Sequence, residues 1–500
     1  MKKISVLISY LAVLSVISRP DNLIASIVDT PEANLKAADQ EWLLDHRQTA
    51  KILYQAEIET TQVKAVPAFN VASLWYIENN IREADKFLEI SLKSNPKYGP
   101  ALLLKGIIEF DRRNLTNCYR FLHQAIKYHP FPEIPNYFLG KFLSERNKIK
   151  EAIEYLNQAI NENKLYTLPY SLLGDCYLRQ KKFKDAIEIL EKGIKYSFDA
   201  EIIYQLARAY WMTGQKEKAL QYYELFKYLF PQHPAAAEVN ELLKENKAKE
   251  VFPFGFEPIP NRNASDRFFP VGENVVYSVY WGIIRVGELN TEIVESLEYN
   301  GNDAYKVRFS LDSNPALEFI ASLHSDYITI IDQDTKLTYQ HYLHLRENNI
   351  ICEKVYDYLR SEGKFICRKV NKDGHIDYLE KYLPVNAIDG TSILFYARQL
   401  VKERRSEFVL TTIDENFVVS VIKYSQIKEP VTVRDQEEQG ILVTGENRYK
   451  GIVGFTGKFR GWFRDNLSYL PLAADFEIWV GRISINIASE EEQRLHKYAR

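Results

Sequence analysis

The spacing of apolar residues along the chain changes near residue 270. Before that point, apolar and small residues recur at intervals of three and four, which is typical of amphipathic helices. In the stretch VGENVVYSVYWGIIRVGELN (271–290) they begin to alternate with their neighbours, as residues of strands do. The pattern therefore predicts two architectures in one chain, a helical half followed by a strand half.

The helical half repeats itself with a period close to 34 residues. A small residue marks the place where we expect the two helices of each repeat to cross, and its occurrences are 34, 34, 34 and 33 residues apart. Proline ends three of the repeats, because it has no N–H and cannot continue a helix. The small residues are Ala84, Cys118, Ala152, Ala186 and Ala219.

This pattern resembles the tetratricopeptide repeat family, and the phrase LPYSLLGDCYLRQKKFKDAIEILEKGI (168–194) is close to that family's consensus. The resemblance implies an α-solenoid of five repeats over residues 65–233. A capping helix region is expected at 30–64 and a C-terminal capping helix at 234–249, because solenoid ends need a polar outer face. Tetratricopeptide arrays are generally peptide-binding scaffolds, so the resemblance also implies a protein partner.

The position of each residue within its repeat predicts which side chains line the groove of the solenoid. A Lys/Asn/Arg clamp for a C-terminal carboxylate, known in this family, is absent from the fifth position of the repeats. The groove is aromatic and apolar instead, and it suits an apolar partner segment. The alternative is that the same side chains are buried against the second domain or the capping helices. The predicted groove residues are Phe69, Tyr76, Leu103, Ile107, Phe110, Tyr137, Lys141, Tyr204, Arg208 and Trp211.

A strap rich in Pro and Phe, residues 250–267, joins the two halves. From 268 to 490, short alternating stretches separated by turn signals predict an antiparallel, strongly curved β-sheet resembling an open barrel or a β-spiral. One helix interrupts it at AIDGTSILFYARQLVKE (387–403), with Asp389 or Thr391 as its cap. The predicted fold class is thus multidomain α + β.

The order of motifs in the strand half resembles an uncharacterised bacterial exported family, a domain of unknown function, over about 268–487. The motifs are FFPVGENVVYSVYWG (268–282), the DGTSILFYAR helix (389–398) and WFRDNLSYLPL (462–472). The family usually has Ser-Asp-Asp where this chain has Arg464-Asp465-Asn466, which puts any role of a paired carboxylate there in doubt. By analogy of pattern, such chains form curved sheets around an apolar groove. Three tryptophans are candidates to line that groove, or else belong to the core: Trp281, Trp462 and Trp479.

The first strand of this half carries apolar residues on both faces from Val275 to Trp281, so we expect it to be covered on both sides. After Gly282 and Gly287 the alternation becomes one-sided. This predicts a strand that bends at the two glycines and emerges towards solvent.

The N-terminus has the pattern of a secretory signal peptide over residues 1–25. Lys2 and Lys3 precede an uncharged run from Ile4 to Ser18, which is too short for a comfortable membrane span. Cleavage after Ser18 or Ala25 would release the protein into the bacterial periplasm, and an uncleaved inner-membrane anchor is the alternative. The formal net charge of −3 gives no electrostatic reason to expect a nucleic acid partner.

No catalytic, metal-binding or cofactor-binding motif stands out. Cys352 and Cys367 flank a predicted hairpin and leave both a disulfide and two free thiols open. We therefore expect a non-catalytic exported scaffold whose repeats hold a protein partner and whose sheet binds an apolar ligand or an envelope partner. The alternatives are an adaptor without a ligand and an envelope-glycan hydrolase that uses Asp465, Asp475 and Glu477.

Overall fold

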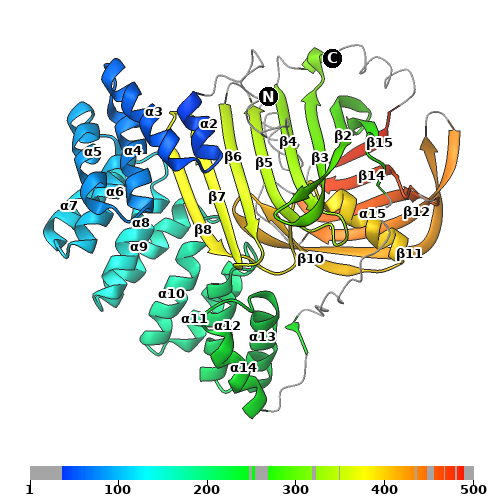
Figure 1. Cartoon of the computed structure of the whole chain (residues 1–500). Helices are drawn as coiled ribbons and strands as arrows, with labels where there is room; N and C mark the ends of the chain where they lie inside the picture. Colours follow the sequence, from blue (N-terminus) through cyan, green and yellow to red (C-terminus); the bar gives the residue numbers. More distant parts are fainter. Residues whose placement is uncertain are drawn as a thin grey trace.

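The computed structural model describes residues 36–246, 251–253, 269–317, 322–347, 350–433, 436–447, 455–466, 468–478 and 481–488. Helices form an arc along one side of a large twisted sheet, and one further helix lies within the curve of the sheet (Figure 1). The predicted leader at 1–25, most of the strap predicted at 250–267 and Trp479 lie outside the described residues.

The helical half is a solenoid in which α4 to α13 pack as consecutive antiparallel pairs, preceded by α2 and α3 and followed by α14. Its helices are α2 (Ala37–Leu43), α3 (Arg47–Thr60), α4 (Ala65–Ile77), α5 (Ile81–Ser94), α6 (Gly99–Asp111), α7 (Leu115–Tyr128), α8 (Glu133–Glu145), α9 (Ile149–Glu162), α10 (Leu168–Arg179), α11 (Phe183–Gly193), α12 (Ala200–Met212), α13 (Lys216–Leu229) and α14 (Ala236–Glu245).

Small residues allow the two helices of each pair to approach closely. A Cβ atom added to Gly140 on α8 would lie 2.7 Å from Cγ of Leu156 on α9, closer than two carbon atoms can pack. The predicted crossing residues are all buried, as Ala152 is at 0% exposure. Each pair turns at a residue with left-handed backbone geometry, which recurs with the period of the repeat: Asn79, Arg113, Asn147, Lys181 and Gly214.

The described strands form one sheet in the order β8-β7-β6-β5-β4-β3-β2-β1-β15-β14-β13-β12-β11-β10-β9. Neighbours are antiparallel except β9 and β10, which are parallel. The strands are β1 (Asn274–Trp281), β2 (Ile284–Tyr299), β3 (Asn302–Ser313), β4 (Leu323–Asp332), β5 (Thr338–Glu347), β6 (Ile350–Leu359), β7 (Lys364–Val370), β8 (Ile376–Tyr382), β9 (Ala387–Asp389), β10 (Glu407–Ile413), β11 (Asn416–Val433), β12 (Gln436–Asn447), β13 (Phe455–Arg464), β14 (Pro471–Ile478) and β15 (Gly481–Ile487).

The sheet curves around helix α15 (Ile393–Glu403), and the face that α15 touches is called the α15 face below (Figure 1). Phe395 of α15 packs edge-on against Phe309 of β3, with ring centroids 5.7 Å apart. On the same face, the ring of His341 stacks between Tyr327 and Tyr356, at 5.7 and 5.8 Å. Large side chains and a helix therefore lie inside the curve of the sheet.

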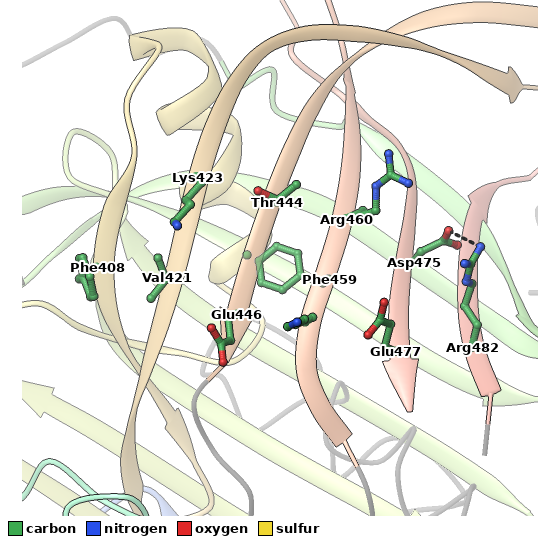
Figure 2. Close-up of a pocket in the computed structure, with 12 residues that line it drawn as sticks. Phe408, Val421, Lys423, Thr444, Glu446, Phe459, Arg460, Asp475, Glu477 and Arg482 are labelled. Atoms are coloured by element: carbon green, nitrogen blue, oxygen red, sulfur yellow. Dashed lines mark hydrogen bonds and ion pairs between the residues drawn. The ribbon is translucent and has the colours of Figure 1, made fainter. Parts of the chain in front are cut away.

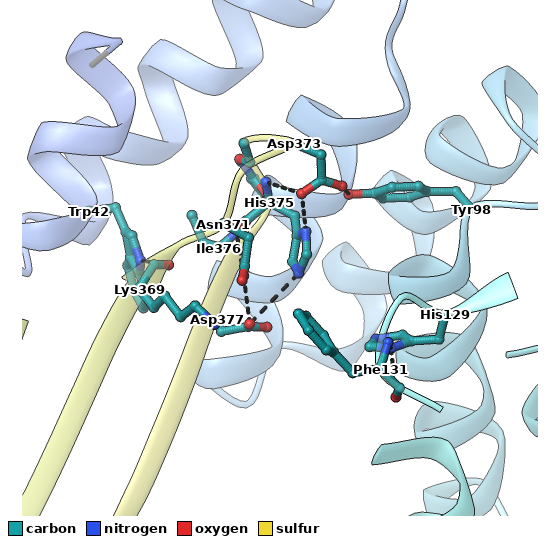
Figure 3. A network of polar contacts seen from close by, with 12 residues as sticks. Trp42, Tyr98, His129, Phe131, Lys369, Asn371, Asp373, His375, Ile376 and Asp377 are labelled. Atoms are coloured by element: carbon teal, nitrogen blue, oxygen red, sulfur yellow. Dashed lines mark hydrogen bonds and ion pairs between the residues drawn. The ribbon is translucent and has the colours of Figure 1, made fainter. Parts of the chain in front are cut away.

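The β7–β8 turn inserts into the start of the solenoid, and this contact forms the first part of the seam, our name for the contact between solenoid and sheet (Figure 3). The Asn70 side chain on α4 donates to the Gly374 carbonyl at 2.9 Å and accepts from the Ile376 N–H at 3.1 Å. His375 lies edge-on to Phe69, and Tyr98 donates to Asp373 at 3.3 Å. One asparagine thus replaces the hydrogen bonds that this turn and edge strand would otherwise make with water.

Helices α2 and α3 form the second part of the seam. They cover the face of the sheet opposite the α15 face, near the β8 edge. The indole of Trp42, which is fully buried, donates to the Lys369 carbonyl at 3.2 Å. Arg368 donates through Nε to the Leu43 carbonyl at 3.0 Å. Trp42 also belongs to a hydrophobic cluster that includes Val355 of β6. The N-terminal region therefore packs on the second domain as well as capping the solenoid.

The β10–β11 turn forms the third part of the seam. The backbone N–H of Phe198, before α12, donates to the Phe417 carbonyl at 2.8 Å, and the Phe417 N–H donates to the Ser197 hydroxyl at 3.0 Å. Beside them, Lys381 of β8 pairs with Asp199 of the solenoid at 3.1 Å. One hydrophobic core runs through this region and contains side chains of both halves. The solenoid and the sheet are consequently packed as one body along the seam.

One sequence-based expectation for the strand half is wrong. Gly282, with φ of +61°, lies in the turn between β1 and β2, so the predicted bent strand is two strands of a hairpin. Val275 to Val279 are buried, as expected for a strand covered on both sides. Of the two alternatives left open for Cys352 and Cys367, the structure has two free thiols, since the register places Cys367 opposite Tyr356 and not opposite Cys352.

The ion pairs of His375 in the seam predict a dependence of stability on pH. Burial alone lowers the pKa of His375, but hydrogen bonds with Asp373 and Asp377 outweigh burial and raise it to about 9. A pKa raised above the unfolded value near 6.5 gives stability that is complete below pH 6.5 and is lost as the pH rises through 9. Urea unfolding followed by tryptophan fluorescence should show a loss of up to about 3 kcal/mol in the wild-type protein over this range.

The matched variant is His375→Gln, which keeps a polar side chain but cannot titrate. Its free energy of unfolding should be lower at pH 6.5 and should change less between pH 6.5 and 9.5 than that of the wild type. Equal pH slopes for the two proteins would show that the His375 pairs do not contribute to the stability of the seam.

Candidate functional site

The seam divides the predicted groove into two parts. The sheet contacts the loops that precede the first helices of the repeats, as at Tyr98 and Phe198, and also the loop before α14 at Gln232. Groove residues near the starts of these helices are on this side. Phe69 is 5% exposed and lies against His375. Leu103 is 9% exposed, Tyr137 is half-buried against Tyr166, and Tyr204 packs on His233, which touches Tyr382 of β8.

The groove residues farther along the first helices form a second part, which we call the open groove. They are half-buried, and within the described part of the chain they make no hydrogen bond, ion pair or ring contact with the sheet. Burial against the second domain is therefore seen for the residues at the helix starts, whereas those farther along remain half exposed. The open groove consists of Tyr76, Ile107, Phe110, Lys141, Arg208 and Trp211.

An aromatic stack lies at the centre of the open groove. The rings of Phe110 on α6 and Phe142 on α8 are nearly parallel, with centroids 3.7 Å apart. The guanidinium of Arg146 lies 5.8 Å from the centroid of Phe110. Phe142 is buried, so Phe110 alone offers a partly exposed apolar ring, and the neighbouring cation makes it suited to an apolar or aromatic side chain.

At the C-terminal end of the open groove, Arg208 and Trp211 are both held from the side. Arg208 bonds Gln205 at 2.8 Å and lies 3.8 Å from a carboxylate oxygen of Asp175. The ammonium of Lys216 lies 5.3 Å from the ring centroid of Trp211. These neighbours fix the two side chains on rigid helices, so they present a defined surface before any partner arrives.

A second hollow, of about 620 Å³, lies on the face of β11–β14 opposite α15 (Figure 2). It contains two of the carboxylates that the sequence suggested for a hydrolase, Asp475 and Glu477. Asp475, however, is paired with Arg482 at 3.1 Å and accepts from Ser484 at 2.6 Å. The third carboxylate, Asp465, lies outside this hollow and pairs with Lys428 at 2.5 Å. The three predicted carboxylates are therefore not brought together.

A third, apolar pocket of about 100 Å³ lies on the α15 face. It is smaller than the cavity of roughly 150 Å³ that is known to bind benzene in an engineered protein, so it accepts only a short apolar group as it stands. Its lining residues are Tyr277, Val279, Leu289, Phe309, Leu311, Gly390, Thr391, Ile393, Leu394, Pro471, Ala473, Ala474, Phe476 and Ile485.

The candidate tryptophans do not line this pocket. Trp281 is half-buried and packs against a core cluster of the strand half. Trp462 packs against the same cluster and donates its indole N–H to Glu429 at 2.9 Å. The structural role, in which these tryptophans support the sheet, accounts for both of them.

Sequence reasoning missed a buried polar cluster around Asp389. This carboxylate accepts hydrogen bonds from the N–H of Thr391 at 2.8 Å and of Ser392 at 3.0 Å, and from the Thr338 hydroxyl at 2.7 Å. His341 lies 3.3 Å away. Burial alone would raise the pKa of Asp389, but His341 and the hydroxyls outweigh it and lower that pKa. The cluster holds the start of α15 and joins β9 to β5.

The DGTS motif was a signal for this cluster, because Asp followed by Thr and Ser is a common start of a helix. The contacts of this cluster with Thr338 and His341, about fifty residues earlier in the chain, could not be predicted from any sequence pattern.

Within the described residues, no group of His, Cys, Asp and Glu has the arrangement of a metal site, and no helix has the length and apolar character of a membrane span.

Comparison with known protein families agrees with the division of the chain into a helical half and a strand half. A family model described as "Protein of unknown function (DUF3108)" matches residues 276–487. Two models described as "Tetratricopeptide repeat" match residues 143–200 and 201–233. No curated protein matches the chain. The tetratricopeptide models indicate repeats suited to protein–protein interaction, and none of the matched models describes a catalytic family.

Solved structures of repeat proteins are similar to part of the chain. PilF of Pseudomonas aeruginosa is 16% identical, over 42% of this chain and 97% of PilF, with a TM-score of 0.36. YrrB, described as a TPR protein with an unusual peptide-binding site, is 20% identical over 38% of this chain and 97% of YrrB, with a TM-score of 0.31. These scores are too low to carry a functional argument. The fold and the family matches together show that the chain carries tetratricopeptide repeats followed by a C-terminal domain of the DUF3108 family, whose function is unknown.

Proposed function

We propose that this protein is a non-catalytic scaffold of the bacterial cell envelope, whose open groove binds an extended segment of a partner protein. One observation carries the proposal: the chain's own sheet occupies the groove at the helix starts and leaves the aromatic surface around Phe110 and Trp211 half exposed. Rigid helices hold that surface, and apolar patches presented in this way are typical of interfaces.

In this proposal the strand half is chiefly an adaptor that holds the solenoid. Helix α15, the β10–β11 turn and the stacked rings around His341 pack within the curve of the sheet. The hydrolase alternative has weaker support, because Asp475 is engaged by Arg482 and Ser484 and Asp465 lies elsewhere. A general acid–base pair needs two carboxyl groups free to face one substrate.

The open groove can be tested with Phe110→Ala and Trp211→Ala in the full-length protein. Truncating two aromatic anchors should reduce the amount of partner protein recovered with the tagged chain from its native envelope by about tenfold or more. Tyr155→Ala is the control, since Tyr155 is a half-buried aromatic residue on α9, a second helix of a repeat. Unchanged recovery with the double variant would rule out the open groove as the binding surface.

Export is a separate part of the proposal and rests on the pattern of residues 1–25. Cell fractionation should place the full-length protein in the envelope, with a mature N-terminus that follows Ser18 or Ala25 by mass spectrometry. A variant without residues 1–25 should remain in the cytoplasm. An intact N-terminus in the membrane fraction would support the uncleaved anchor, and a cytoplasmic full-length protein would contradict export.

An apolar ligand of the sheet is a second candidate function, favoured by the apolar pocket near α15. Protein purified from its native envelope should then retain a lipid or other apolar molecule that is detected by mass spectrometry. Ala474→Leu, which fills the pocket, should abolish retention, whereas Val63→Leu, at an exposed site on the solenoid, should not. If the wild type retains no such molecule, the apolar-ligand hypothesis fails and the adaptor without a ligand remains.

A further inference from the structure

We propose that the partner segment accepted by the open groove is acidic as well as apolar. The inference rests on the proposed function and adds the chemistry of the partner. The inference starts from the charges beside the aromatic stack, because those charges determine which apolar segments the open groove binds and which it repels.

Lys141 is a cation without a partner in the middle of the open groove. It lies on α8 at the position that Ile107 has on α6 and Arg208 has on α12, and it is half-buried. Among the described residues, no carboxylate oxygen lies within 4.0 Å of its ammonium group. Glu145, one helical turn farther along α8, does not pair with it. The charge of Lys141 is therefore available to a ligand.

Arg146, at the end of α8, is a second cation without an acidic partner. Its guanidinium lies near the ring of Phe110, and no ion pair engages it within the described part of the chain. Three cations on or beside other first helices are instead engaged by acidic residues of neighbouring helices. Lys105 and Arg112 share Asp85, and Arg208 lies near Asp175. Arg146 thus lies beside the ring of Phe110, and Lys141 directly precedes Phe142 of the stack on α8.

A segment that fits this surface places an apolar side chain on the ring of Phe110, beside Ile107. It then directs an Asp or Glu carboxylate towards Lys141 or Arg146. Burial of the apolar side chain around the ion pair excludes water and strengthens the attraction between the charges. A segment with Lys or Arg in the same place would leave like charges facing one another.

The test is a selection of random twelve-residue peptides by the full-length protein. Peptides retained by the wild type should be enriched in apolar residues followed or preceded by Asp or Glu. Selection by Lys141→Glu should lose this enrichment and gain Lys and Arg. Lys150→Glu makes the same change of charge at an exposed position on α9 and should select as the wild type does.

The affinity of one selected acidic peptide, measured by fluorescence anisotropy, should fall about three- to tenfold in Lys141→Gln and further in Lys141→Glu. Circular dichroism and thermal unfolding should match the wild type, since the Lys141 side chain makes no hydrogen bond or ion pair with other described residues. Peptides enriched without regard to charge, or equal affinities for the wild type and Lys141→Glu, would overturn the acidic preference.

The two proposals fail in different ways. If Phe110→Ala and Trp211→Ala abolish peptide binding while charge has no effect, the open groove is the binding surface and only the acidic preference is wrong. If peptides bind equally to these alanine variants, the proposed function itself fails.

Discussion

The structure depends on how the free edge of its sheet is covered. Strand β8 ends a long sheet, and an uncovered edge of this kind exposes unpaired N–H and C=O groups to any other strand. Here the solenoid covers it: Asn70 bonds the β7–β8 turn, Trp42 lies over one face, and Lys381 reaches from β8 to Asp199. Because the covering element is a repeat array, the contact extends along every repeat and produces a shared core.

The same contact divides the solenoid by function. Loops and helix starts that touch the sheet are buried and contribute to stability, whereas the later turns of the same helices keep their aromatic and charged side chains half exposed. In an ordinary repeat array each unit contacts only its neighbours. In this chain a second domain contacts all of them, and the surface left for other molecules is what that domain does not cover.

The sequence was most informative where a pattern is local and repeated. The small residues from Ala84 to Ala219 follow a 34-residue period because each fills the same crossing, so their spacing alone predicts the helix pairs. The curved antiparallel sheet and α15 were predictable from alternation and from the DGTS motif. The contacts between residues that are far apart in the sequence were not predictable. Asn70 reads as an ordinary helix residue, and nothing near it indicates that its side chain bonds residues three hundred positions later. The turn at Gly282 was misread because a glycine within alternating residues fits a bend as well as a hairpin.

The attachment of the sheet along the solenoid also has a mechanical consequence. A free solenoid stretches and twists easily, since small rotations between neighbouring repeats add up along its length. Here Asn70, Phe198 and Gln232, from the first to the last repeat, are bonded to one continuous sheet. The distance between successive helices is thereby fixed, and so is the spacing of the side chains they present. If the open groove binds a segment as proposed, the fixed spacing selects segments by the interval between their anchoring residues. An elastic array would instead change its pitch to fit other intervals.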